Sequence, residues 1–161
     1  MSAEMFIKIG DVKGEARGKG HEDEIDVLSW SWGASQSGSF HTGGGGGAGK
    51  VNVQDLSFTK YVDKASPVLT LMCCNGEHID KAVLTVRKAG KKPLEYIIIE
   101  MTKVMVTSVS HGGSGGEEKL TENVTLNFAL VTYKYQPQKD DGSKDGGTID
   151  MGWDIEANVA K

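Results

Sequence analysis

Polar and apolar residues alternate along most of this chain, and short glycine-rich segments interrupt the alternation. Within Thr121–Tyr135, for example, Val124, Leu126 and Phe128 alternate with polar residues. A period of two is typical of a β-strand with one buried face, because successive side chains point to opposite sides. The chain is therefore expected to fold mainly as β-strands.

Several segments carry this pattern or are rich in β-branched and aromatic residues. In chain order they are Met5–Ile9, Ile25–Trp32, Val51–Tyr61, Ala82–Lys88, Leu94–Met101, Lys103–Val109, Thr121–Tyr135 and Thr148–Ile155. Strands at such short spacing indicate a sandwich or a barrel, and a barrel removes exposed strand edges. We predict one domain over residues 1–161, a closed or partly closed antiparallel β-barrel.

One short α-helix is predicted at about residues 66–75. Ser66 is suited to cap its first amides, Pro67 to its first position, and Gly76 to the residue after its end. The residues between are apolar on nearly every side of the helix, namely Val68, Leu69, Leu71, Met72, Cys73 and Cys74. We therefore expect the helix to be buried all round, in the barrel mouth or under a neighbouring subunit.

Cys73 and Cys74 are adjacent, so a disulfide between them would be strained. A redox motif has two residues between its thiols, and a zinc site needs more ligands. We interpret both as buried free thiols.

Two strands are apolar beyond what a small barrel needs. Tyr96–Ile99 is apolar on both faces, and the apolar face of Thr121–Tyr135 shifts after Leu130 to Val131, Tyr133 and Tyr135. An apolar outer face needs cover. Another subunit or the chain's own helix and loops would provide that cover, and the pattern alone leaves both open.

The segment Gly44–Lys50 matches the phosphate-loop pattern Gly-x-x-x-x-Gly-Lys. That chemistry also needs Ser or Thr after the lysine and a helix N-terminus facing the phosphate. Here Val51 follows Lys50, and the next residues alternate as a strand. We therefore interpret Gly43–Lys50 as a loop that contacts another protein surface and not as a nucleotide site.

No catalytic, cofactor-binding or metal-binding residues are assigned. Asp140–Gly147 lacks the carboxylate spacing of a calcium loop, and His21–Glu24 is interpreted as a solvated charge run. The net charge of −4 argues against nucleic-acid binding and against a cationic membrane-surface protein. No signal peptide or membrane-spanning segment is recognised, so we expect folding in the cytoplasm and, if the protein is exported, a route without a signal peptide.

Five stretches closely resemble the haemolysin-coregulated protein (Hcp) family of bacterial type VI secretion systems. They are Met5–Glu15, Glu24–Gly33, Gly43–Asp63, Leu120–Ala129 and Tyr135–Gly147. The resemblance extends from about Met5 to Val159. It implies a β-barrel similar to phage tail-tube proteins, hexameric rings and stacking of these rings into a secreted tube. It also implies a VgrG spike, a contractile sheath, an assembly platform and small effector proteins in the ring lumen as partners.

The resemblance also implies roles for particular residues. Ser29 and Ser31 would line the lumen, while Trp30 and Trp32 would point into the barrel core. The loop that contacts neighbouring subunits would consist of Gly43, Gly44, Gly45, Gly46, Gly47, Ala48, Gly49 and Lys50. The Gly90–Pro93 turn, which begins with Gly90, and the segment near Glu156 would lie on opposite ring faces. We hypothesise in addition that Lys91 and Lys92 face Asp154 and Glu156 in a salt-sensitive contact between rings.

The preferred interpretation is a non-enzymatic structural and carrier protein. One alternative is a nucleotide-dependent enzyme built on Gly44–Lys50. The other is a secreted binding module that acts on target cells.

Overall fold

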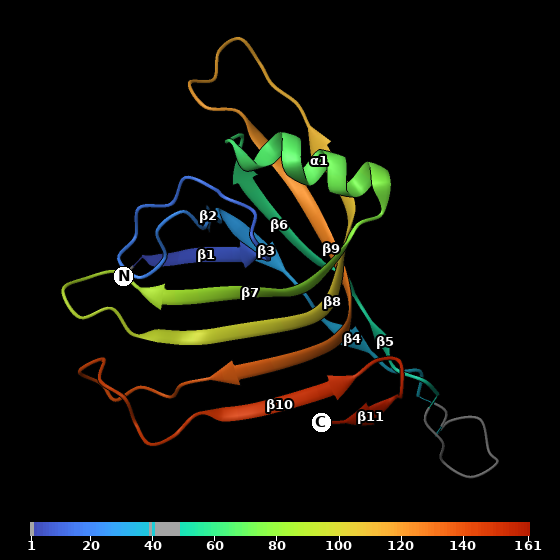
Figure 1. The fold of residues 1–161 in the computed structure, drawn as a ribbon. Coiled ribbons are helices and arrows are strands. Elements are labelled where there is room, and N and C mark those ends of the chain that lie inside the picture. The colour runs from blue at the N-terminus through green and yellow to red at the C-terminus, as the bar shows by residue number, and fades with distance from the viewer. Residues whose placement is uncertain (1, 39, 41–48) are drawn as a thin grey trace.

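The protein is described by a computed structural model covering residues 2–38, 40 and 49–161. Its strands are β1 Ala3–Ile9, β2 Ile25–Asp26, β3 Ser29–Ser31, β4 Ala34–Ser35, β5 Asn52–Val53, β6 Leu56–Tyr61, β7 His78–Lys88, β8 Glu95–His111, β9 Thr121–Tyr135, β10 Ile149–Asp154 and β11 Val159–Ala160. One helix, α1 Ala65–Asn75, lies between β6 and β7 (Figure 1). The prediction of a mainly β fold with one short helix is confirmed.

The sheet follows the order β11-β10-β9-β8-β7-β1-β2, and β6 pairs with both β9 and β3. β1 and β6 do not pair with each other, and the segment that joins β2 to β3 lies between them and forms backbone hydrogen bonds with both. Val27 N–H donates to the Met5 carbonyl over 2.9 Å, and Leu28 N–H donates to the Thr59 carbonyl over 2.8 Å. The strand ladders themselves do not form a complete ring, so the barrel is partly closed.

This change of partner corrects one sequence prediction. The sequence predicts Ile25–Trp32 as one strand, and the period of two in such a strand would put Leu28 on the same face as Trp30 and Trp32. The structure buries Ile25 and Val27 and leaves Leu28 38% exposed. Two short strands replace the single one because the chain leaves β1 after Val27 and joins β6 at Leu28, which reverses the side that faces the core.

Both long strands change the face that they turn toward the core partway along their length. The predicted strands Leu94–Met101 and Lys103–Val109 are a single strand, β8, in which Lys103 adopts a left-handed φ of 56°. On either side of Lys103, Met101 pairs with Val131 and Val104 pairs with Phe128. All four of these side chains are buried, so the inward face changes from odd-numbered to even-numbered residues on β8.

The same change occurs on β9, where Val124, Leu126 and Phe128 are buried in one half and Val131 in the other. The predicted shift of the apolar face within Thr121–Tyr135 is therefore confirmed. The tryptophans also pack against the core as expected, and Trp32 lies 6.4 Å from Phe128 between ring centroids.

The helix begins one residue earlier than predicted, and Ser66 is not its cap. The Asp63 carboxylate accepts the Ala65 N–H over 2.9 Å. The Ser66 hydroxyl instead accepts from the Asp63 N–H over 3.0 Å and donates to Glu122 over 2.5 Å. Pro67 is the third helical residue, where an amide has no partner inside the helix. Gly76 ends the helix in the left-handed conformation with a φ of 67°, as predicted.

The helix is buried on one side only. Leu69 is fully buried, whereas Val68 is 42% exposed and Leu71 62% exposed. Cys73 is half-buried and Cys74 exposed, so the prediction of two buried thiols is wrong. The helix covers one end of the barrel and presents its remaining apolar surface outward.

A buried ion pair anchors the start of this helix. Lys60 Nζ donates to Glu122 over 2.5 Å and to Asp63 over 2.7 Å, and both Lys60 and Glu122 are inaccessible to solvent. Burial alone would raise the pKa of Glu122, but hydrogen bonds from Lys60 and Ser66 hold that pKa below its ordinary value. The network joins β6, β9 and the first turn of α1.

We predict that Lys60→Met destabilises the protein by about 3–5 kcal/mol, because it removes the buried ammonium group that pairs with both Glu122 and Asp63. The double variant with Glu122→Leu should recover most of this loss. Denaturant unfolding at a fixed protein concentration measures both variants, since assembly would shift the apparent stability. Equal destabilisation of the single and double variants would contradict this account.

Candidate assembly surfaces

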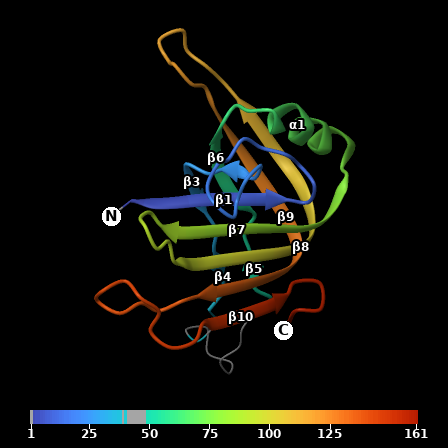
Figure 2. The same cartoon turned by 60° about the vertical axis from the view of Figure 1, so that its left-hand side comes forward.

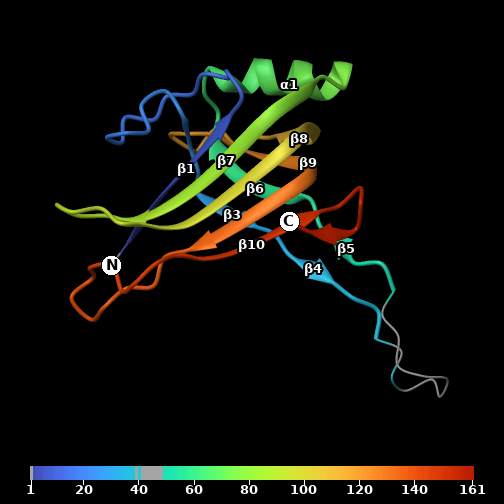
Figure 3. The ribbon, with the colours of Figure 1, turned by 60° about the horizontal axis from the view of Figure 1, so that its bottom comes forward.

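The glycine-rich loop is carried by a two-stranded ribbon outside the barrel. β4 and β5 pair Ala34 with Val53 and Ser35 with Asn52, and the ribbon extends away from the body (Figure 3). Gly43–Ala48 lie outside the described residues, while Gly49 and Lys50 are described and exposed. The chain after Lys50 forms the strand β5, so the helix N-terminus that a phosphate loop requires does not follow it.

Small uncharged side chains cover the outward side of the sheet formed by β3, β6, β9 and β8. Pairing aligns Ser29 with Thr59 and Ser31 with Ser57 across β3 and β6. β9 then aligns with β6, and the second half of β8 aligns with β9. The resulting surface, called the polar wall below, consists of Ser29, Ser31, Ser57, Thr59, Thr107, Ser108, Ser110, Asn123, Thr125 and Asn127, all exposed or half-buried.

Hydrogen bonds within the polar wall fix these side chains. Thr59 donates to Asn123 over 2.6 Å, and the Ser108 and Thr125 hydroxyl oxygens lie 2.7 Å apart. Asp55 at the margin accepts from Thr107 over 2.9 Å and from Asn127 over 2.8 Å. Apart from this carboxylate the wall presents neutral donors and acceptors, which suits hydrogen bonding to varied protein surfaces.

Ser29 and Ser31, the two residues predicted to line the lumen, belong to a larger polar surface that spans four strands. Sequence reasoning missed the residues on β6, β8 and β9. The signal was present, because small polar residues occupy every second position from Thr121 to Asn127 and again at Ser57 and Thr59. Assigning them to one surface required the strand order, which places residues far apart in the chain on the same rung.

Charged groups occupy the two ends of the strands. Lys91 and Lys92 are exposed in the turn between β7 and β8, whereas Asp154 ends β10 and Glu156 follows it (Figure 1). Pairing places Asp154 beside Leu130, Leu130 beside Thr102, and Thr102 beside Lys81. Lys81 therefore lies level with Asp154 across the sheet, whereas the turn with Lys91 and Lys92 comes after Lys88, seven residues further along β7. Seven residues of a strand span roughly 23 Å, so the lysines and the acids are separated by about the length of the strands.

The acidic end has contacts within the chain. Asp154 accepts the Ala157 N–H over 3.0 Å, and Glu156 lies 3.8 Å from Lys103 Nζ. Both members of the second pair are about 70% exposed (71% and 69%), so that pair contributes little to stability. The carboxylates therefore remain accessible to a partner.

Several exposed large apolar side chains form two patches. The helix-side patch consists of Val68 and Leu71 on α1. The β10-side patch consists of Tyr135, Ile149 and Met151, which share one face of the sheet. The other exposed large apolar residues lie outside both patches: Leu28, Tyr61, Val62 and Leu120 line a separate hollow, Val159 lies on the opposite face of the sheet from Ile149, and Phe40 is beside the glycine-rich loop. Figures 1 and 2 show α1 at one end of the molecule and β10 with β11 at the opposite end. Leu71 is 62% exposed and Ile149 66%, so both patches are available for contact with a partner surface.

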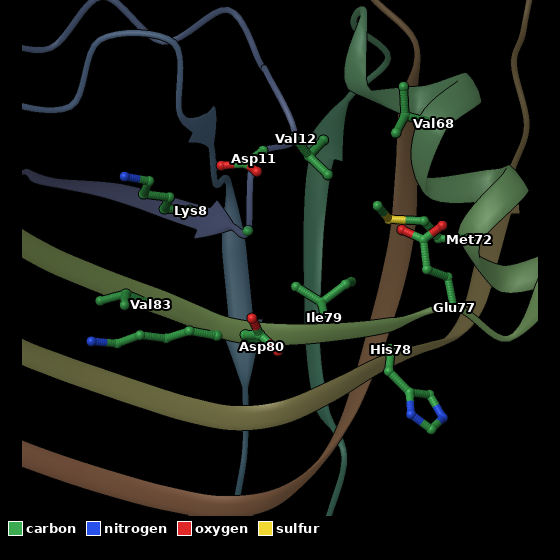
Figure 4. A pocket seen from close by; sticks show the side chains of 12 residues that line it. Lys8, Asp11, Val12, Val68, Met72, Glu77, His78, Ile79, Asp80 and Val83 are labelled. Atoms are coloured by element: carbon green, nitrogen blue, oxygen red, sulfur yellow. The ribbon is translucent and has the colours of Figure 1, made fainter.

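A hollow of about 640 Å³ lies beside the helix-side patch, between α1 and the beginning of β7. Val68 and Met72 line it from the helix, and Ile79 lines it from β7 (Figure 4). Asp11 and Asp80 add carboxylates to the same hollow. Lys8 and Lys81 also line the hollow, and an open surface of mixed apolar and charged character suits contact with another protein.

Comparison with known proteins agrees with this architecture. Residues 6–135 match the family model described as the type VI secretion system effector Hcp. Protein hcp1 of Pseudomonas aeruginosa is 65% identical over 160 residues, which cover 99% of each chain. A crystal structure of Hcp1 from Salmonella typhimurium superposes with a TM-score of 0.80 at 37% identity, covering 100% of both chains.

A second solved structure, of a type six secretion system protein, superposes with a TM-score of 0.93 at 29% identity. It covers 99% of this chain and 100% of that one. The family match spans most of the chain, and the Pseudomonas relative spans nearly all of it. The chain therefore belongs to the Hcp family, the tube subunits and effectors of type VI secretion systems.

Proposed function

We propose that this chain is a non-catalytic subunit that forms hexameric rings, which stack into a secretion tube and carry small effector proteins in the lumen. The observation that carries the proposal is the orientation of its surfaces. Apolar patches lie at two opposite ends of the molecule, and opposite charges lie at the two ends of the strands. The polar wall covers a third side.

Ring closure requires a head-to-tail contact between two different surfaces of one subunit. The helix-side patch and the β10-side patch have the required opposite positions. Burying Leu71 and Ile149 against a neighbour would remove from water the two most exposed large apolar side chains of the patches. An apolar outer surface covered by another subunit was one of the two possibilities left open by the sequence.

Ring stacking would involve the charged groups at the two ends of the strands and not the apolar patches. Gly90, Lys91 and Lys92 at one end would approach Asp154 and Glu156 of the next ring. Lys91, Lys92 and Glu156 are exposed and Asp154 is half-buried, so this contact is expected to weaken with salt.

The polar wall is proposed to face the lumen. Neutral hydroxyl and amide groups bind effectors by hydrogen bonds without selecting one charge pattern. Contacts with a VgrG spike, a sheath and an assembly platform, and export without a signal peptide, are inferred from family membership. Among the described residues, no helix is long and apolar enough to cross a membrane.

We predict that Leu71→Glu lowers ring affinity at least about tenfold, because it places an unpaired charge in the subunit contact. Native mass spectrometry or light scattering measures the hexamer fraction across protein concentrations. Lys144→Glu, in the turn before β10 and outside both patches, is the matched control and should form normal rings. Unchanged assembly of Leu71→Glu would exclude the helix-side patch from the contact.

We also predict that Lys91→Glu with Lys92→Glu leaves rings intact but reduces their stacking. The reduction should be greatest at low salt, where charge attraction is least screened. Charge reversal at Asp154 and Glu156 in the same chain should restore stacking. Negative-stain imaging and sedimentation across salt concentrations measure tube length, and unchanged tubes in the lysine variant would contradict the assignment.

A further inference from the structure

His21 is buried between two carboxylates, although the sequence indicated a solvated charge run. It is 7% exposed. Its Nδ1 lies 2.9 Å from Glu24 and its Nε2 lies 2.7 Å from Glu95. An ionised carboxylate accepts hydrogen bonds and donates none, so satisfying both contacts requires a hydrogen on each ring nitrogen. The geometry therefore fits the protonated, positively charged imidazolium.

The His21 ring also packs on the barrel. It stacks on Phe6 of β1 with ring centroids 4.6 Å apart. Arg87 of β7 lies 4.9 Å from the same Phe6 centroid, and its guanidinium donates to Glu4 over 3.2 Å. The charged groups around His21 are thus Glu22 and Glu24 from its own loop, Glu95 from β8, and Arg87 with Glu4 across Phe6.

Burial alone would lower the pKa of His21, but the hydrogen bonds and charges of Glu24 and Glu95 raise it above 6.5. A raised pKa means that the folded state binds the proton more tightly than the unfolded chain does. The resulting stabilisation is complete below about pH 6.5 and is lost as pH rises through the raised pKa. Glu24 and Glu95 then remain as two neighbouring carboxylates without a cation between them.

The position of Glu95 connects this cluster to the stacking turn. Glu95 begins β8 directly after the turn that carries Lys91 and Lys92. Lys88 N–H donates to the Leu94 carbonyl over 3.1 Å at the base of that turn. The bond from His21 to Glu95 therefore fastens the loop of residues 11–24 to the strand end from which the turn projects.

We propose that His21 is a pH-sensitive latch, which holds the Lys91–Lys92 turn ready for ring stacking while its imidazolium bridges Glu24 and Glu95. This inference rests on the proposed stacking function and adds its regulation. Loss of the proton breaks one bridging hydrogen bond and removes one positive charge from the lysine-bearing end. Stacking is then weaker in mildly alkaline than in mildly acidic solution.

The test compares wild-type rings with His21→Gln, whose amide cannot acquire the charge. Sedimentation at constant ionic strength between pH 6.0 and 8.5 measures the stacking constant. We expect it to fall at least about fivefold for the wild type, the lower end of the usual coupling between two linked sites. His21→Gln should show no such fall and should remain near the wild-type alkaline value. His111→Gln, a half-exposed histidine at the end of β8 that lies outside both charge sets and both apolar patches, is the control and should behave as wild type.

The outcomes separate this inference from the function on which it rests. Failure of the wild type to form rings at any pH would overturn the ring proposal itself. Rings that stack with the same pH dependence in wild type and His21→Gln would overturn only the latch. Hydrogen exchange in unstacked rings provides a second readout, because amides of residues 11–24 should exchange faster as pH rises in wild type, after correction for intrinsic exchange. If exchange of those amides were independent of His21 protonation, the latch would again be excluded.

Discussion

The left-handed residue Lys103 lets β8 change the face that it turns toward the core, and the arrangement of surfaces depends on this change. Before it, β8 turns Ile99 and Met101 inward, and after it Val104 and Val106. A strand that kept a strict period of two would send half of these side chains to the solvent. β9 changes its inward face at the position that pairs with this part of β8. The two strands together therefore supply side chains both to the apolar core and to the hydroxyl-rich half of the polar wall.

Partial closure of the barrel follows from the same use of the strands. β9 pairs with β6 in its first half and with β10 in its second, so β10 and β11 extend the sheet beyond the barrel instead of closing it. Their apolar residues Ile149 and Met151 then have no cover within the described part of the chain, while α1 covers only the other end. A fully closed barrel would give a more self-sufficient monomer but would lack the two complementary ends that a head-to-tail ring requires.

The sequence was most informative where periodicity alone determines structure. The face change in β9, the apolar helix and its glycine end could be read locally. It was least informative where distant residues decide the result. Ile25–Trp32 looks like one strand because nothing in it reveals a change of partner from β1 to β6. The polar wall likewise depends on strand order, which brings Ser29 beside Thr59 and Thr59 beside Asn123.

Buried charges mark the places where this limitation matters most. Lys60 and His21 lie in ordinary polar stretches, yet each is buried against a carboxylate more than sixty residues away, at Glu122 and Glu95 respectively. An unpaired buried charge at either site would cost several kcal/mol of folding free energy. Each pair therefore favours the one arrangement of strands and loops that brings its two partners together. The Lys60 pair is inaccessible to solvent, which suits a permanent anchor for α1. The His21 pair uses the one side chain whose ordinary pKa lies near neutrality, which makes the attachment of its loop reversible.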